Sequence, residues 1–198
     1  MNDYNIRVAC IKDAEELLEI YSYYVENTAI TFEYDVPTLA EFEERMKKII
    51  EEYPYIVMEM DGKIVGYAYA GQFKNRPAYD WCVETSIYVH KDYKGRGIGR
   101  ELYRVLEDIL KLQNILNLNA CIAYIDEDDE YLNKDSTYFH EKMGYRLVGE
   151  FYKCGYKCNR WYNMIWMEKF IGEHIDNQPS VIKFKDLDIS SVEKCTKK

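Results

Sequence analysis

The feature that most constrains this chain is a glycine-rich segment, residues 94–99, in which three glycines alternate with larger residues. The residues before it, 81–89, are predicted to form a strand, and those after it an amphipathic helix that ends near Gln113. Glycines let backbone N–H groups approach an anion closely, and a helix N-terminus adds unsatisfied donors and the positive end of the helix dipole. This strand–turn–helix unit therefore predicts a binding site for a pyrophosphate group.

The spacing of the glycines excludes two common pyrophosphate motifs. A Rossmann fingerprint needs G-x-G-x-x-G, but its third glycine would fall at Arg100 or at Leu102. A P-loop needs G-x-x-x-x-G-K followed by serine or threonine, and the sequence has no such run. The remaining pattern, [Q/R]-x-x-G-x-[G/A], resembles motif A of the GNAT acetyltransferases, with Lys94 in place of the usual glutamine or arginine.

Hydrophobic periodicity predicts an α/β chain with the element order β-α-α-β-β-β-α-β-α-β-β. We expect a mixed, mostly antiparallel central sheet of six to seven strands, flanked by about four helices. The expected strands are residues 6–9, 55–60, 63–71, 81–89, 116–124, 145–153 and 160–169, and the expected helices are residues 14–25, 38–52, 98–113 and 136–143.

Local signals mark where some of these elements begin and turn. Asp13 with Glu16, and Thr38 with Glu41, have the spacing of a capping box, in which the first residue caps a helix and the second reaches back. Gly155 stands between the last two expected strands and is predicted to form their turn. The acidic run at 126–130 is predicted to be a solvated loop.

The length of 198 residues fits one domain, residues 1–171, followed by a polar tail, residues 172–198. The sequence leaves open whether this tail is disordered, lies on the body of the protein or lies on a partner subunit. A formal net charge of −9 argues against nucleic acid or an anionic membrane as partner, because both require a dominant basic field.

The protein is expected to be cytoplasmic, because its first residues lack the layout of a signal peptide and no stretch reaches the roughly 18–20 apolar residues of a membrane span. The six cysteines are therefore interpreted as reduced thiols. Cys154 and Cys158 are four apart, which is not the spacing of a redox or zinc motif, and no metal site is predicted.

Beyond the glycine turn, residues 6–170 resemble the phosphinothricin and methionine sulfoximine acetyltransferase branch of the GNAT superfamily. The matching segments are DG at 61–62, GYAYAG at 66–71, Arg76, AYDW at 78–81, VETSIYV at 83–89, FHEKMGY at 139–145, and GYK at 155–157 together with RW at 160–161. The segment FHEKMGY and the combined segment GYK…RW are specific to this branch. Many GNAT enzymes carry a tyrosine where this chain has His140.

The resemblance implies that acetyl-CoA binds where two central strands splay apart, near Val89. Its pantetheine arm is expected to pair with the backbone like an added strand, and its pyrophosphate to lie on the amides of the glycine turn. The cofactor-binding residues expected on this basis are Tyr88, Val89, His90, Lys94, Gly95, Arg96, Gly97, Ile98, Gly99 and Asn133.

Transfer to an amine requires removal of an ammonium proton, a donor for the carbonyl oxygen and a proton for the leaving thiolate. By the resemblance, Glu84 is the expected general base and His140 the second catalytic residue, as acid or as base. The Val89 amide is the expected oxyanion donor. The alternatives are a solvent-facing carboxylate for Glu84 and a structural histidine for His140.

The acceptor implied by the resemblance is a small amino-acid-like amine, such as methionine sulfone, methionine sulfoximine or phosphinothricin. Besides Glu84, Arg76 is expected to bind an acceptor anion and Phe32 to form an apolar wall. Direct transfer in a ternary complex is expected, and the family suggests a homodimer. The alternative functions are acetylation of a protein or peptide amine, and a non-catalytic acyl-CoA sensor.

Overall fold

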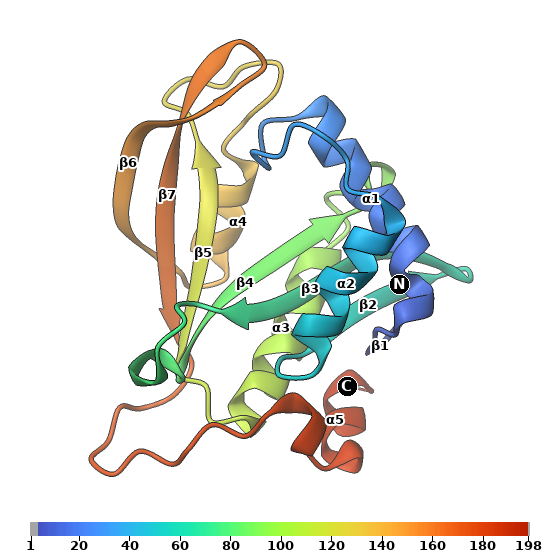
Figure 1. Cartoon of the computed structure of the whole chain (residues 1–198), viewed down its shortest axis with the longest axis vertical. Helices are drawn as coiled ribbons and strands as arrows, with labels where there is room; N and C mark the ends of the chain where they lie inside the picture. The colour runs from blue at the N-terminus through green and yellow to red at the C-terminus, as the bar shows by residue number, and fades with distance from the viewer. Residues whose placement is uncertain (1–3, 198) are drawn as a thin grey trace.

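A seven-stranded sheet organises the computed structural model, which describes residues 4–197 (Figure 1). The strand order is β1-β2-β3-β4-β5-β7-β6, and every neighbouring pair is antiparallel except β4 and β5. The strands are Tyr4–Val8 (β1), Tyr55–Met60 (β2), Lys63–Gln72 (β3), Cys82–Val89 (β4), Asn117–Tyr124 (β5), Arg146–Lys157 (β6) and Arg160–Phe170 (β7). The expected mixed, mostly antiparallel sheet is confirmed.

Helices cover both faces of the sheet. The helices are Ala14–Asn27 (α1), Leu39–Ile50 (α2), Ile98–Leu112 (α3), Asp135–Lys142 (α4) and Ile189–Thr196 (α5). Helices α1 and α2 pack with one face in a tyrosine-rich core, while α3 and α5 pack with the other in an aliphatic core. In Figure 1, α1 and α2 cross in front of the sheet and α3 and α4 lie behind it. About four helices were expected; α5, in the tail, is the additional one.

Side chains along β4 alternate between these two cores, as the two-residue repeat of a strand requires. Val83 and Ile87 pack on the α3 side, whereas Tyr88 packs on the α1 side. Glu84 and Ser86 have the same parity as Tyr88, so they also face the α1 side. This alternation decides on which face each candidate catalytic group acts.

One of the two predicted capping boxes forms. Thr38 Oγ1 accepts a hydrogen bond from the Glu41 amide at 3.3 Å, and Glu41 accepts one from the Thr38 amide at 2.8 Å. The prediction for Asp13 and Glu16 was wrong. A 3₁₀ turn precedes α1, and the Asp13 carboxylate is held by Arg7 at 2.7 Å instead of capping the helix. Glu16 accepts a bond from the Ile64 amide at 3.1 Å.

The predicted turn at Gly155 was also wrong. Strand β6 continues through Lys157, and the chain reverses at Cys158 and Asn159, whose φ angles of 51° and 58° lie in the left-handed region. Gly155 follows a register shift within β6 that begins at Phe151. The glycine therefore serves packing inside the strand rather than the turn.

The tail lies on the body of its own chain. The amide of the fully buried Gln113 side chain donates to the carbonyls of Glu52 at 2.8 Å and Ile182 at 2.7 Å, which ties the tail to the end of α3. Further on, Val192 and Cys195 of α5 are buried in the aliphatic core. Of the three alternatives left by the sequence, docking on the body is therefore the observed one.

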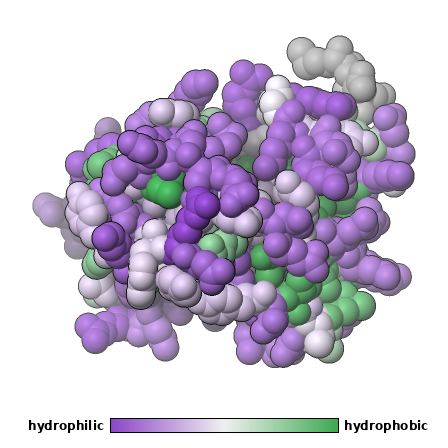
Figure 2. All heavy atoms as spheres, turned by 90° about the horizontal axis from the view of Figure 1, so that it is seen from above, coloured by the Kyte–Doolittle hydropathy of each residue, from purple (hydrophilic) through white to green (hydrophobic). Residues whose placement is uncertain are grey.

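No helix within residues 4–197 is long and apolar enough to cross a membrane. The surface seen from above is largely hydrophilic, with hydrophobic residues gathered in a few places (Figure 2). Within the same residues, no cluster of histidine, cysteine, aspartate or glutamate is arranged to hold a metal ion.

We predict that Gln113→Ala lowers the free energy of unfolding by about 1–3 kcal/mol, because the carbonyls of Glu52 and Ile182 lose the donor that a fully buried side chain provides. It should also accelerate proteolysis between residues 173 and 183. Urea denaturation and limited proteolysis measure the two effects, with Lys111→Ala, an exposed position near the same helix end, as the control. Equal stability and cleavage in both variants would contradict this role for Gln113.

Candidate active site

The parallel pairing of β4 with β5 is short. It spans three residue pairs, from Cys82–Asn117 to Glu84–Asn119. Beyond these pairs β4 stays paired with β3 as far as Val89, and β5 stays paired with β7 as far as Tyr124. The two strands therefore diverge into a fork that opens upward in Figure 1.

The diverging part of β4 presents backbone groups to this fork. The His90 amide donates to the Val65 carbonyl of β3 at 2.9 Å. Because successive peptide groups of a strand point in opposite directions, the peptide groups of Ile87 and Val89 turn away from β3 and toward the fork. The Tyr24 hydroxyl of α1 donates to the Val89 carbonyl. An extended ligand arm thus finds the Val89 N–H and the Ile87 peptide groups along this edge.

Side chains secure the root of the fork. The buried Thr85 hydroxyl donates to the Asn119 carbonyl at 3.2 Å, and the Asn119 side-chain amide donates to the Val83 carbonyl, also at 3.2 Å. The same amide lies 2.9 Å from the Cys82 sulfur. These bonds bridge the two strands where the ladder ends, so they fix the position at which the strands part.

The glycine-rich turn opens α3 just after β4, as the sequence predicted. Gly95 and Gly97 have φ angles of 75° and 83°, a conformation that side chains disfavour, and Gly97 is the N-cap of α3. The Lys94 ammonium lies 4.9 Å from the Tyr24 ring centre, and the Arg96 guanidinium 4.8 Å from the Tyr93 ring centre. With both cationic side chains resting on aromatic rings, backbone amides at the start of α3 are the donors best placed for an anion.

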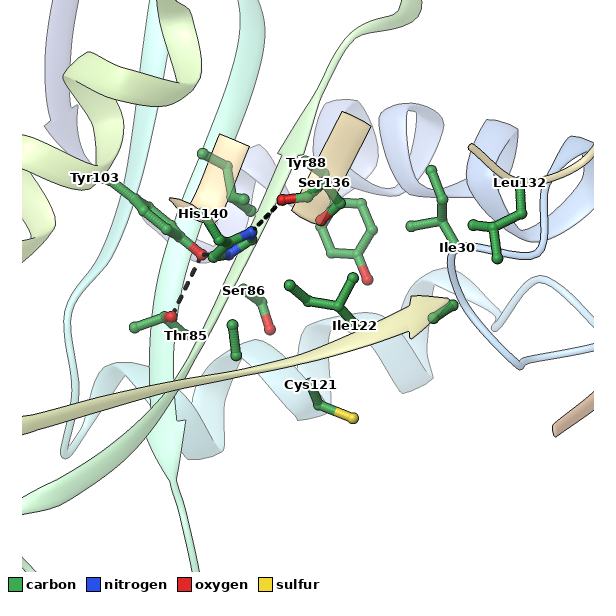
Figure 3. Close-up of a pocket in the computed structure, with 13 residues that line it drawn as sticks. Ile30, Thr85, Ser86, Tyr88, Tyr103, Cys121, Ile122, Leu132, Ser136 and His140 are labelled. Carbon is green, nitrogen blue, oxygen red and sulfur yellow. Dashed lines mark hydrogen bonds between the residues drawn. The ribbon is translucent and has the colours of Figure 1, made fainter. Parts of the chain in front are cut away.

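A pocket fills the fork and is lined from both faces of the sheet (Figure 3). Its lining residues are Ile30, Thr85, Ser86, Ile87, Tyr88, Tyr103, Ala120, Cys121, Ile122, Ala123, Leu132, Ser136 and His140. The lining thus combines apolar side chains with several hydroxyl groups and one imidazole, which can orient a small molecule by hydrogen bonds.

Glu84 stands at the root of the fork and is half-buried. Burial raises the pKa of its carboxyl, and the positive charge of Lys74 offsets part of that rise. The charge of Glu84, after burial itself, also contributes to raising the pKa of the Cys121 thiol, to about 11. Glu84 is thus a carboxylate of increased basicity next to the pocket, and not the fully solvated strand carboxylate of the alternative interpretation.

Lys74 is a residue that sequence reasoning missed. Its ammonium lies 5.0 Å from the ring centre of Phe73 and 5.7 Å from that of Trp166, so the charge is held over the face of the sheet that carries Glu84. The only signal in the sequence was its place two residues before Arg76.

His140 is buried at 3% exposure, and both ring nitrogens have partners. The Ser136 carbonyl, 2.7 Å from Nδ1, can only accept, so Nδ1 carries the proton. Nε2 then accepts from the Tyr103 hydroxyl at 3.0 Å. Burial lowers the pKa of His140 to about 4, so the ring is neutral near pH 7.

Tyr103 links His140 to the root of the fork, as the dashed lines in Figure 3 show. Its hydroxyl is 3.3 Å from the Thr85 hydroxyl, which is in turn 3.1 Å from the Tyr145 hydroxyl. Sequence reasoning missed Tyr103 and Thr85 because each has the appearance of an ordinary core residue at its position in a helix or strand.

The other residues expected at the site, Phe32, Arg76 and Asn133, lie in three different places. Phe32 is half-buried and packs against Tyr162, with ring centres 6.5 Å apart. Arg76 is exposed at the start of a 3₁₀ turn and is not among the residues that line the fork. Asn133 is exposed just before α4, where its side-chain oxygen accepts from the Asp135 amide at 3.1 Å.

The loop between α1 and α2 forms a roof over one end of the fork. The buried Lys157 ammonium donates to the Val25 carbonyl at 2.7 Å and the Thr31 carbonyl at 2.8 Å. The Phe32 ring lies so close to Gly155 that a Cβ there would fall 2.3 Å from a ring carbon. The roof, residues 28–34, is thus attached to β6, and Gly155 is required for its close approach.

The acidic run at 126–130 contributes to the same region. Asp129 accepts from the backbone amides of Tyr131 and Leu132, each at 2.8 Å, and from the Tyr162 hydroxyl at 3.0 Å. Arg160 pairs with it at 2.9 Å. The prediction of a solvated loop was therefore wrong for Asp129, whose carboxylate organises the turn because four donors converge on it.

The fork, the glycine turn and the intervening pocket have counterparts in known proteins. The family model for the acetyltransferase (GNAT) domain matches residues 6–166. The chain belongs to the GNAT acetyltransferase family. This GNAT protein is therefore an acetyl-CoA-dependent acyltransferase.

Individual relatives show which members of this family the chain is similar to. It is 31% identical to phosphinothricin N-acetyltransferase of Streptomyces viridochromogenes, over 83% of this chain and 87% of the relative. It is 30% identical to L-methionine sulfoximine/L-methionine sulfone acetyltransferase of Salmonella typhimurium, over 85% and 95%. The crystal structure of a phosphinothricin acetyltransferase from Sinorhizobium meliloti in complex with AcCoA aligns with a TM-score of 0.81 and 31% identity, covering 92% of this chain and 96% of that one.

The contact between the roof and Gly155 gives a testable prediction. In Gly155→Ala the new methyl displaces the Phe32 ring, so the apparent KM for the acceptor should rise by about tenfold or more. Gly149→Ala on the same strand is the matched control, because nothing lies within 4 Å of a Cβ there. Initial rates at varied acceptor concentration measure both, and equal values in the two variants would refute a role for this contact.

Burial of neutral His140 predicts a pH-dependent stability. The unfolded histidine, with a pKa of 6.5, binds a proton more readily than the folded one, with a pKa of about 4, so lowering the pH favours unfolding. Between pH 6.5 and pH 4 the wild type should lose about 3 kcal/mol that His140→Gln does not lose, at about 1.4 kcal/mol per pKa unit. Urea denaturation across this range tests it; parallel pH dependences for the two proteins would contradict the assignment.

Proposed function

We propose that this enzyme transfers the acetyl group of acetyl-CoA directly to the amine of a small amino-acid-like acceptor, of the methionine sulfone, methionine sulfoximine or phosphinothricin type. The observation that carries the proposal is the half-buried Glu84 carboxylate at the root of the fork, where a base is needed. The acceptors named for the relatives support the choice of substrate class.

The residues around the fork fit acetyl-CoA. The Val89 N–H and the Ile87 peptide groups suit the amide-bearing pantetheine arm, and the amides from Gly95 to Gly99 suit its pyrophosphate. Tyr88 and His90 flank Val89 in this edge, and Lys94, Arg96 and Ile98 supply backbone to the turn. Asn133, at the start of α4, is proposed as a further contact at the rim. When bound, acetyl-CoA supplies the acetyl group as a thioester.

Glu84 is proposed as the general base, acting on the ammonium of the acceptor directly or through one water. Its raised pKa increases its affinity for a proton, while the charge of Lys74 favours the ionised form that can accept one. The free amine then attacks the thioester carbon, a C–N bond forms and the C–S bond breaks. The Val89 N–H is the proposed donor to the carbonyl oxygen.

His140 is proposed to act through Tyr103 and not as a charged acid. Because the ring is neutral with Nδ1–H fixed on Ser136, its Nε2 lone pair orients the Tyr103 hydroxyl at the pocket. Burial raises the pKa of Tyr103, so that hydroxyl keeps its proton near neutral pH. In the proposed step this single proton turns from His140 Nε2 to the leaving sulfur, to which the Tyr103 hydroxyl then donates a hydrogen bond.

The pocket cysteine supports direct transfer. A pKa of about 11 keeps the Cys121 thiol protonated near neutral pH, and a protonated thiol is a poor nucleophile. An acetyl-cysteine intermediate at this position is therefore disfavoured. The roof over the fork likewise favours a small acceptor over a protein amine, which needs an open groove.

For the acceptor anion, Arg76 and Lys74 are the proposed cations, and Phe32 the apolar wall. We also propose that the enzyme forms a homodimer and that it is located in the cytoplasm. The exposed apolar side chains Leu147, Val148 and Phe151 along edge strand β6 offer a surface for such an assembly.

We predict that Glu84→Gln lowers kcat by about 100-fold or more, the usual contribution of a general base. Wild-type kcat should rise with pH through an acidic limb centred above 4.5, the ordinary glutamate value, and this limb should vanish in the variant. Thiol release with mass detection of the acetylated product, across a panel of amino acids, provides the measurement.

Glu44→Gln, at an exposed position on α2, is the control and should retain wild-type rates. If the wild type bound acetyl-CoA but formed no acetylated product with any acceptor, the proposed function would be wrong.

A further inference from the structure

A second cavity, of about 130 Å³, lies between α2 and the sheet. Five tyrosines line it: Tyr21 from α1, Tyr55 from β2, Tyr67 and Tyr69 from β3, and Tyr88 from β4. Their rings pack in sequence, with centres 4.7 Å apart for Tyr55 and Tyr69 and 5.4 Å apart for Tyr67 and Tyr88. We name this space the tyrosine pocket.

Two of the five tyrosine hydroxyls in this pocket lack hydrogen-bond partners among the described residues. Tyr55 and Tyr67 are 2% and 1% exposed, and neither hydroxyl has a hydrogen bond within residues 4–197. Over that range, the only fully enclosed side-chain polar atom without a partner is Gln113 Oε1. The two hydroxyls are therefore not sealed in the core but reach the space of the pocket, where they need an oxygen or nitrogen to accept their protons.

The charged side chains that line the tyrosine pocket neutralise each other. Among its lining residues the charged ones are Arg45 and Glu33, which pair with each other at 2.7 Å. The negative charge of Glu33 acts inside the pocket, because it contributes, after burial, to raising the pKa of Tyr88. A buried anion would find no uncompensated cation here and would bear its full desolvation cost. A neutral group with strongly accepting oxygens incurs no such cost.

The pocket adjoins the fork. Tyr88 lines both spaces. Tyr69 pairs in register with Ser86, and the next position on the same face of the sheet is Glu84, about 7 Å along the strand. An amino acid whose amine lies at Glu84 therefore has its side chain within reach of the tyrosine hydroxyls.

We infer that the tyrosine pocket binds the side chain of the acceptor, and that it selects a neutral, oxygen-bearing group such as a sulfone or sulfoximine over both a thioether and an anionic phosphinate. This inference rests on the proposed function and narrows it. The hydroxyls of Tyr55 and Tyr67 donate to the side-chain oxygens, and the Glu33 carboxylate disfavours an anion.

The test compares methionine, methionine sulfone and phosphinothricin as acceptors for the full-length enzyme. The wild type should prefer the sulfone by about tenfold or more in kcat/KM. Tyr55→Phe/Tyr67→Phe keeps the rings but removes the donors, so it should lower kcat/KM for the sulfone about tenfold and for methionine less than threefold. Glu33→Gln leaves Arg45 uncompensated and should improve phosphinothricin relative to the sulfone. Tyr53→Phe, a buried tyrosine outside the pocket, is the control.

Calorimetric titration of the same acceptors into the CoA-loaded protein tests the role of the tyrosine pocket separately from the proposed acetyl transfer. Hydroxyl-dependent sulfone binding without turnover would uphold the pocket and overturn the proposed function. Turnover with equal losses, or no losses, for sulfone and methionine in the double variant would uphold the function and overturn the pocket, which would then hold only water. A Glu33→Gln variant with an unchanged preference would overturn the selection against anions.

Discussion

The short parallel ladder between β4 and β5 is the constraint on which the rest of the site depends. Each strand is held on its outer side, β4 by β3 and β5 by β7, so the two can part after Glu84 without losing their place in the sheet. Thr85 and Asn119 bridge them at that point. The separation leaves peptide groups of β4 without strand partners while keeping them rigidly placed, which is what an extended ligand arm requires.

Burial then sets the protonation state of the groups around the fork. It keeps His140 neutral, raises the pKa of Glu84, and holds Cys121 as a thiol. Burial raises the pKa of an acid and lowers the pKa of a base, because in both cases it disfavours the charged form. The charge of Lys74 offsets part of the effect of burial at both Glu84 and Cys121, but of these two only Glu84 is a carboxyl, whose ordinary pKa lies below neutral pH. Glu84 is therefore the group best suited to take up a proton.

Two segments that the sequence presents as loop or tail complete the molecule. The roof is held on β6 by Lys157 and by the contact of Phe32 with Gly155, and it encloses one end of the fork. The tail is held at the opposite end of α3 by Gln113. Both use a single buried polar side chain to bind carbonyls of a distant segment, which anchors irregular chain without requiring a long apolar element.

What the sequence determined by itself was mostly local. Alternating glycines before an amphipathic helix defined the turn at 94–99, and Thr38 with Glu41 defined a helix start, because both depend on residues within a few positions of each other. The matching segments also predicted Glu84 and His140 as site residues; in the structure Glu84 lies at the root of the fork and His140 lines the pocket. The tertiary structure alone decided that His140 is neutral, that Lys74 and Tyr103 belong to the site, that Asp13 pairs with Arg7 instead of capping α1, and that the five tyrosines enclose a pocket. The physical reason is that desolvation and hydrogen bonding depend on residues that are far apart in the chain. Lys157 and Val25, for example, are 132 residues apart and share a hydrogen bond. A local sequence pattern cannot predict such a contact.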